Sequence, residues 1–218
     1  SLEAALCAAG AVCAAVDALI DGEDKRAFCA VRPPGHHATR AAAMGFCLFN
    51  NIAAGAAHAL ARGLERVAIV DFDVHHGNGT QDIFWSEPHV LYASTHQSPL
   101  YPGSGARNET GAGNIVNAPL PPGAGSAQFR AAMSEIVLPR LAQFWPQLVM
   151  ISAGFDAHRL DPLASLNFDA EDFAWATREL VAVANAHAQG RVVSSLEGGY
   201  SLTALRESTA AHVTALME

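Results

Sequence analysis

The sequence predicts an α/β fold: three layers, with a mostly parallel central sheet covered by helices on both faces. Short apolar segments alternate along the chain with longer segments of helical periodicity, which is typical of strand–helix units and a parallel sheet. The expected strands are also apolar on both faces, as in sheets buried between two helical layers. The 218 residues, half of them hydrophobic, fit one domain with a single core.

The first half of the chain is expected to supply three helices and three strands. One helical face over residues 2–20 is formed by apolar residues at spacings of three and four, namely Leu2, Leu6, Ala9, Cys13, Val16 and Ile20. The apolar run 27–31 is stopped by Pro33 and Pro34 and reads as a strand. There follow a helix over 49–62 with Gly63 at its end, a strand over 66–71, a short helix near 79–86 and a strand over 89–95.

The second half repeats the alternation after a segment over 97–126 that is rich in Gly, Pro and Asn and is expected to be a loop. A helix over 127–145, interrupted by Pro139, leads to a strand over 147–152. The next helix runs from Asp169, which resembles a capping pair with Asp172, to about Gln189, where Gly190 ends it. A strand over 191–196 and a helix after Ser201 complete the chain.

The composition argues against nucleic acid binding and membrane binding. The formal net charge is −8 and there is no basic run, so we expect no nucleic acid partner and no anionic membrane surface. No stretch reaches the roughly 18 uninterrupted apolar residues of a transmembrane helix, and no signal peptide is recognised at the start. The four cysteines lack CxxC pairing and are expected to be reduced core thiols of a cytoplasmic protein: Cys7, Cys13, Cys29 and Cys47.

Unusual polar residues follow the carboxyl end of every strand expected from the sequence. Ligands of open α/β sheets bind outside these ends, so we expect the clusters to converge on one site. The five clusters are Arg32 to His37, Asp71 to Asn78, Ser94 to Gln97, Asp156 to His158 and Glu197 to Tyr200.

Three of these residues are candidate metal ligands. Asp73 and His75 are two apart, so on an extended segment both side chains point to one side. Asp156 would supply a third ligand from another strand end. One imidazole and two carboxylates with open positions are typical of a catalytic zinc (Zn²⁺) site, with ferrous iron (Fe²⁺) as an alternative. A hydrogen-bonded turn would explain Asp73 and His75 if they stood alone.

Candidates for proton transfer lie beside the metal ligands. His36 and His37 sit in a turn framed by Gly and Pro, and imidazole titrates in the range that suits a general base and acid. Tyr200 follows two glycines that let the backbone approach a substrate, so its hydroxyl could donate to a carbonyl. Asp71 is placed to orient one of the histidine rings or to help bind a monovalent cation.

The motifs RPPGHHA, GFCLFNN, DFDVHHGNGTQ, AGFDAH and LEGGY, in this order and spacing, resemble the histone deacetylase superfamily in its class II and bacterial amidohydrolase-like branch. They span residues 32 to 200. The resemblance implies the arginase-deacetylase fold and zinc-dependent removal of acyl groups from amines. The implied substrate is acetyl-lysine or a similar acylated amine, with an acetylpolyamine or other small acylamine as an alternative.

The resemblance also implies roles for individual residues. Asp73, His75 and Asp156 resemble the zinc ligands, and Tyr200 resembles the residue that polarises the carbonyl. Asp71 accompanies His36, whereas Asn78 stands beside His37 where some deacetylases have a second aspartate. A neutral amide cannot hold an imidazolium as a carboxylate does, so His37 is assigned as general base and then acid, and His36 as the histidine that stays protonated.

The implied substrate channel has Gly45, Phe46 and Tyr101 in its walls, although the family more often has Phe at the last of these positions. Leu163 matches the rim, where a polyamine-selective relative would carry an acidic residue, so its apolar character argues against polyamine specificity. Asp71, Ser94 and Thr95, with Asp73 and His75, resemble a structural potassium (K⁺) site.

One departure leaves alternatives open. The resemblance implies a further N-terminal segment, so residues 1–218 are expected to be a single deacetylase catalytic domain that lacks it. A non-catalytic acyl-lysine-binding relative is therefore a second interpretation. A ureohydrolase of the arginase kind, with two manganese ions, is a third, but Gly77 and His158 stand where further carboxylates would be needed. The oligomeric state is left open.

Overall fold

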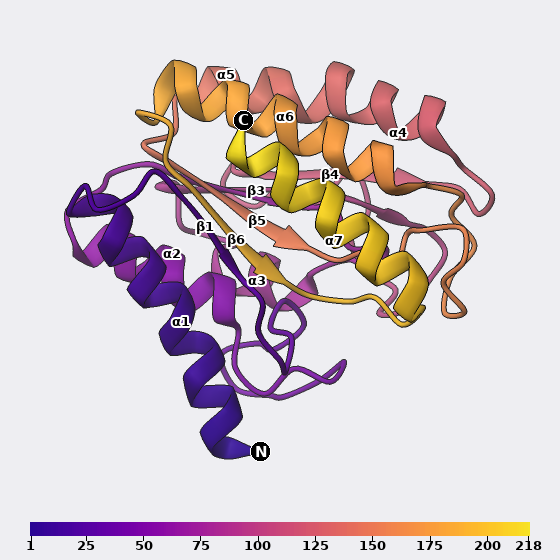
Figure 1. The fold of residues 1–218 in the computed structure, drawn as a ribbon, viewed down its shortest axis with the longest axis horizontal. Helices are drawn as coiled ribbons and strands as arrows, with labels where there is room; N and C mark the ends of the chain where they lie inside the picture. Colours follow the sequence, from indigo (N-terminus) through magenta and orange to yellow (C-terminus); the bar gives the residue numbers. More distant parts are fainter.

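The computed structural model describes all 218 residues, and its centre is one sheet of six parallel strands (Figure 1). The strands are β1 (Arg26–Cys29), β2 (Val67–Asp71), β3 (Val90–Gln97), β4 (Ile115–Leu120), β5 (Leu148–Ala153) and β6 (Val192–Leu196). The helices are α1 (Leu2–Ile20), α2 (Asn51–Ala61), α3 (Asn78–Ile83), α4 (Ser126–Ala132), the π-helical turn η1 (Met133–Val137), α5 (Leu138–Phe144), α6 (Ala170–His187) and α7 (Leu202–Met217). Across the sheet the order is β1-β6-β5-β2-β3-β4.

Helices cover both faces of this sheet, which confirms the predicted fold class. Figure 1 shows α4 to α7 on one side and α1 to α3 on the other. Successive residues of β2 belong to two separate apolar clusters, one on each face of the sheet. Ala68 and Val70 pack on the side of α4 to α7, and Val67 and Ile69 pack on the side of α1 and α2. Period-two alternation with apolar residues on both faces is what a doubly covered strand requires.

One strand was missed in the segment expected to be a loop. Residues 115–120 form β4, which pairs with β3 at the edge of the sheet. Pro119 and the surrounding glycines weakened the strand signal. Proline is tolerated in an edge strand because one side of the ladder needs no N–H donor. The third predicted polar cluster, Ser94 to Gln97, consequently lies within β3 rather than after it.

The interruption expected at Pro139 is present. Instead of one helix over 127–145 the chain forms α4, the π-helical turn η1 and α5 in succession. Pro139 has no N–H to donate to the preceding turn, so the regular α-helical hydrogen bonding is interrupted there. The π-helical turn η1 lies directly before this position. The capping pair before α6 is also present, since Asp169 accepts from the N–H of Glu171 and donates its own N–H to Asp172.

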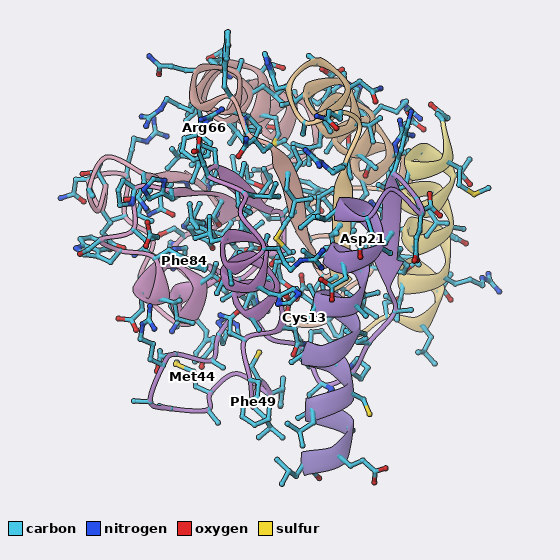
Figure 2. The ribbon with its side chains drawn as sticks, turned by 90° about the vertical axis from the view of Figure 1, so that its left-hand side faces the viewer. Cys13, Asp21, Met44, Phe49, Arg66 and Phe84 are labelled. Atoms are coloured by element: carbon cyan, nitrogen blue, oxygen red, sulfur yellow. The ribbon has the colours of Figure 1, made fainter.

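The helix α1 is confirmed, but the apolar face predicted for it is wrong except at Val16. Its buried residues are Ala5, Ala8, Val12, Val16 and Leu19, whereas Leu2 and Leu6 are 63% and 57% exposed. The small residues face inward because α1 and α2 pack closely: a Cβ added at Gly55 would lie 2.5 Å from Val12 Cγ1. Figure 2 shows the first turns of α1 extending past the rest of the chain, with the loop of Met44 and Phe49 close by.

Two compositional expectations can be compared with the structure, and one of them needs correction. By length and composition alone α1 could cross a membrane, although Glu3 and Asp17 interrupt its apolar residues, as the sequence analysis found. Its inner face contributes to the core beneath the sheet. All four cysteines are unpaired, but Cys7 is exposed and only Cys29 and Cys47 are buried. The expectation of core thiols therefore does not apply to Cys7.

Candidate metal centre and active site

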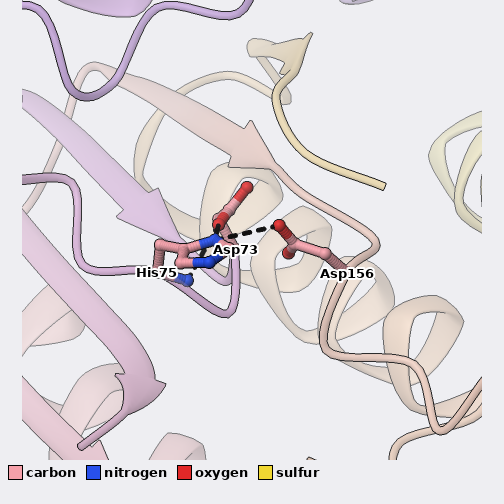
Figure 3. Close-up of side chains that lie close together, drawn as sticks. All are labelled: Asp73, His75 and Asp156. Atoms are coloured by element: carbon pink, nitrogen blue, oxygen red, sulfur yellow. Dashed lines mark hydrogen bonds and ion pairs between the residues drawn. The ribbon is translucent and has the colours of Figure 1, made fainter. Parts of the chain in front are cut away.

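Two neighbouring strands bring the three candidate metal ligands together at their carboxyl ends (Figure 3). Asp73 and His75 follow β2, and Asp156 follows β5, which pairs with β2. One ligand atom from each side chain lies within 4.8 Å of the others. His75 Nδ1 is 3.2 Å from Asp73 Oδ1 and 3.1 Å from Asp156 Oδ2. The three side chains that the sequence predicts as metal ligands therefore lie close enough together to bind one ion.

The backbone leaves room for these carboxylates because two positions are glycine. A Cβ at Gly154 would lie 2.0 Å from Asp73 Oδ2, and a Cβ at Gly198 would lie 2.1 Å from Asp156 Oδ2. Backbone N–H groups also orient the carboxylates: Gly198 donates to Asp73 at 2.8 Å and Val74 donates to Asp156 at 2.9 Å. Each carboxylate retains lone pairs for a further partner.

The electrostatics of this cluster favour a bound cation. Both aspartates are 1% exposed, and burial together with the charge of Asp73 raises the pKa of Asp156 to about 7. Burial alone would lower the pKa of His75, but hydrogen bonds with Asp156 and Asp73 raise it to about 10. The raised pKa of His75 shows that the two buried carboxylates attract positive charge, which a bound cation could supply in place of the proton of His75. An imidazole and two carboxylates, open on one side, are a donor set that fits a catalytic divalent ion.

His36 is held by a buried carboxylate. Its Nδ1–H donates to Asp71 Oδ2 at 3.0 Å, and the hydroxyl of Tyr92 donates to the same oxygen at 3.0 Å. Burial alone would lower the pKa of His36, but the charges of Asp73 and Asp71 outweigh it and raise the pKa well above its usual value. His36 is therefore protonated, as expected from its carboxylate partner.

His37 has a neutral partner instead. Its Nδ1 lies 2.8 Å from Asn78 Oδ1, while the amide nitrogen of Asn78 donates to the carbonyl of His37. The proton therefore lies on Nδ1 and the lone pair on Nε2, an assignment that follows from the hydrogen-bond network. Burial and the charge of His36 lower the pKa of His37 to about 3, so the ring is neutral. A Cβ at Gly45 would lie 2.2 Å from His37 Cδ2, so the loop of Gly45 closes against this ring.

Two further residues support the histidines: Tyr92 was missed in the sequence, and Glu197 was found in a polar cluster but given no role. Tyr92, in the middle of β3, joins Asp71 to the turn at Gly77, whose N–H donates to the Tyr92 hydroxyl at 3.0 Å. Glu197, at the end of β6, accepts the N–H groups of Gly35 at 2.7 Å and His36 at 3.1 Å. Its burial raises its pKa to about 7 despite these hydrogen bonds. A tyrosine in a buried strand was the available signal, because a buried hydroxyl usually has a partner.

Tyr200 lies in the turn between β6 and α7. Burial and then the charges of Asp73 and Asp156 raise its pKa, so the phenol keeps its proton at neutral pH. A protonated hydroxyl in this field can donate a hydrogen bond to an oxygen that becomes negative during a reaction.

The three remaining candidate substrate residues, called the rim below, have large exposed side chains: Phe46, Tyr101 and Leu163. The ring of Tyr101 lies 5.2 Å from that of His37, and the ring of Phe46 lies 6.1 Å from that of Tyr200. Phe46 is 71%, Tyr101 47% and Leu163 45% exposed. The exposed rings of Tyr101 and Phe46 therefore lie beside His37 and Tyr200, where a ligand could contact them.

The candidate potassium residues adjoin one another in the sheet. Asp71 and Ser94 are register partners in β2 and β3, and Asp71 Oδ1 accepts the N–H of Asp73. Ser94 is already hydrogen-bonded to His96 Nδ1 at 2.9 Å, whereas the buried Thr95 hydroxyl has no partner. Because Thr95 follows Ser94 in β3, its side chain points to the other face of the sheet, so only its backbone could join Asp71 and Ser94 around one cation.

Comparison with known proteins identifies the relatives of this chain. The family described as "Histone deacetylase domain" matches residues 1–216. A "Probable deacetylase" of Archaeoglobus fulgidus is 46% identical over 202 residues, covering 91% of this chain and 56% of the relative. A "Histone deacetylase-like amidohydrolase" of Pseudomonas aeruginosa is 46% identical over 207 residues, covering 92% of this chain and 54% of the relative.

A solved structure agrees with these matches. The crystal structure of the HDA15 HD domain superposes with a TM-score of 0.94 at 41% identity, covering 99% of this chain and 62% of that one. The chain therefore spans about half the length of the first two curated relatives and somewhat more of the solved domain.

Proposed function

Because this chain belongs to the histone deacetylase family, we propose that it is a zinc-dependent deacetylase that hydrolyses the amide of acetyl-lysine, or of a similar acylated amine, to acetate and the free amine. The observation that carries the proposal is the convergence of Asp73, His75 and Asp156 within 4.8 Å, with a neutral and a protonated histidine beside them. Deacetylase and amidohydrolase relatives support the same reaction class.

Zinc is proposed as the ion because a single imidazole with two carboxylates fits its catalytic sites; ferrous iron has overlapping preferences. When bound, the ion would supply Lewis-acid polarisation of the amide carbonyl and of the attacking water. We also propose potassium beside Asp71, Ser94 and Thr95, together with the backbone near Asp73 and His75, where it would support the metal ligands structurally.

The protein's own groups account for the proton transfers. His37 Nε2 is the free base and takes a proton from the attacking water. The hydroxyl of Tyr200 donates to the carbonyl oxygen as it becomes negative. His37 then returns its proton to the leaving amine; its low pKa makes the imidazolium a strong acid for that step. His36 stays charged throughout because Asp71 and Asp73 stabilise it.

The test compares His37→Ala with the wild type on a fluorogenic acetyl-lysine peptide, with metal content measured on the same samples. Removing a proton-transfer group costs on the order of 10²–10⁴ in rate, so the variant should keep its metal but lose nearly all turnover. His89→Ala is the matched control, because His89 is exposed and directly precedes β3, at the amino end of the sheet, where its ring is hydrogen-bonded to the carbonyl of Glu65. Near-normal turnover in His37→Ala would remove the proposed role.

Other outcomes separate the remaining candidates. A panel of acylated amines decides between acyl-lysine and acetylpolyamine, and Leu163 at the rim favours the former since it offers no charge to a polyamine. Binding of metal and of a hydroxamate without turnover on any substrate would point to a non-catalytic acyl-lysine-binding protein. Two metal ions per chain would favour a ureohydrolase, although one three-ligand cluster is found in this structure.

A further inference from the structure

A buried carboxylate outside the proposed mechanism joins two loops of the active site. Asp161 lies in the segment between β5 and α6 and is 7% exposed. Its Oδ2 accepts the backbone N–H of Tyr200 at 2.7 Å and that of Ser201 at 3.2 Å. Its Oδ1 accepts the N–H of Leu163 at 3.0 Å. One side chain thus satisfies three donors, two from the turn of Tyr200 and one from the rim.

The turn of Tyr200 has little else to fix it. Gly198 and Gly199 precede the tyrosine, and Gly199 has φ +140, a conformation that side chains disfavour. Hydrogen bonds connect the backbone of this turn to the loop after β5 and to the metal centre only as far as Gly198. The carbonyl of Gly198 accepts the N–H of Phe155, and its own N–H donates to Asp73. The Tyr200 hydroxyl has no hydrogen bond in this structure. The carboxylate of Asp161 is therefore the polar contact that sets the backbone from which the ring projects.

The same carboxylate also holds Ser201, the residue at which α7 begins. Ser201 caps α7 by accepting the N–H of Ala204, so a displaced Ser201 would shift the start of that helix. On the other side, the bond to Leu163 holds the rim residue to the same anchor. A shift at the rim and a shift at Tyr200 are coupled through one rigid, two-oxygen group.

We propose that Asp161 is a positioning residue, which holds the hydroxyl of Tyr200 at the carbonyl of the substrate and ties that geometry to the Leu163 rim. The inference rests on the proposed deacetylase function for its kinetic consequence. Its structural part, the anchoring of the Tyr200 backbone, stands on the three hydrogen bonds alone.

The substitution Asp161→Asn isolates the effect. Asparagine keeps the size of the side chain but has one oxygen, so its amide nitrogen must face either the Leu163 N–H or the N–H groups of Tyr200 and Ser201. Asp169→Asn is the matched control, since Asp169 also accepts a backbone N–H, at the start of α6, and asparagine is an equally good helix cap.

The kinetic test is a double-mutant cycle with Tyr200→Phe in the metal-loaded chain. A misplacement of about 1 Å can cost on the order of 100-fold in rate, so Asp161→Asn should lower kcat by about 10- to 100-fold with metal content unchanged. In the Tyr200→Phe background the same substitution should cost less than about 2-fold, because the hydroxyl that it positions is already absent. Equal losses in both backgrounds would overturn the proposal.

Hydrogen exchange supplies a readout that needs no activity. In the wild type and in Asp169→Asn the amides of Tyr200 and Ser201 should be protected, and in Asp161→Asn they should exchange at least about 10-fold faster. Unchanged protection would overturn the anchoring role. If the wild type proves inactive on all acylated amines while the exchange behaves as expected, the proposed function fails and the anchoring role stands.

Discussion

The buried charged residues of the site, called the floor here, differ from the rim residues in exposure, in charge and in hydrogen bonding. The floor residues Asp73, Asp156 and His36 are at most 2% exposed, carry charge, and have hydrogen-bond partners on neighbouring strand ends. At the rim, Phe46 and Leu163 are apolar and largely exposed. Buried charges must be paired, so the floor has one permitted geometry, whereas the rim can vary at little cost. We therefore expect changes in the floor to abolish chemistry and changes in the rim to alter substrate preference.

The largest expected effect comes from filling space in the floor. Gly198→Ala would put a methyl group 2.1 Å from Asp156 Oδ2 and 2.7 Å from Asp73 Oδ2. Both proposed ligands must move, so metal affinity should fall by more than the 10- to 100-fold that is typical of losing an outer-shell contact. Isothermal titration with zinc and the metal content after dialysis measure this.

The matched control is Gly10→Ala in α1, where an added Cβ meets nothing within 4 Å. It should leave metal affinity unchanged and stabilise the helix by about 0.5–1 kcal/mol, measured by thermal unfolding. Wild-type zinc affinity in Gly198→Ala would mean that the buried ligands can move without loss of metal binding. The floor would then not be more rigid than the rim.

The same contrast explains what could be predicted from the sequence. Asp73, His75 and Asp156 were found because each follows an apolar run, and parallel strands bring their carboxyl ends to one edge. Tyr92 and Asp161 were missed because their roles depend on partners 21 and 39 residues away, which periodicity does not report. The edge strand β4 was missed for a local reason, since its proline is acceptable only where the neighbouring side of the ladder is empty.

An intermediate effect is expected one step behind the floor. Tyr92→Phe removes the hydroxyl that donates to Asp71 and accepts from Gly77, leaving His36 as the remaining side-chain donor to that oxygen. Loss of an outer-shell partner costs about 10- to 100-fold, so kcat/KM should fall by about 10-fold. The unpaired N–H should also lower stability by about 1–3 kcal/mol. Stopped assays and thermal unfolding of the same samples test both effects; a lower Tm with full activity would limit Tyr92 to stability.

The smallest effect is expected at the rim, where Leu163→Glu adds a charge to an exposed position. An exposed ion pair is worth about 0.2–1 kcal/mol, so KM for a cationic acetylpolyamine should fall by about 5-fold at most, and the gain should shrink at high salt. Leu163→Gln, with the same shape and no charge, should show no gain. Turnover of a neutral acetyl-lysine peptide should stay within about 3-fold in both variants, because the side chain is 45% exposed and only its backbone N–H contacts Asp161. A 100-fold loss of kcat on that peptide would show that the rim takes part in the chemistry, and the division between a rigid floor and a permissive rim would then be wrong.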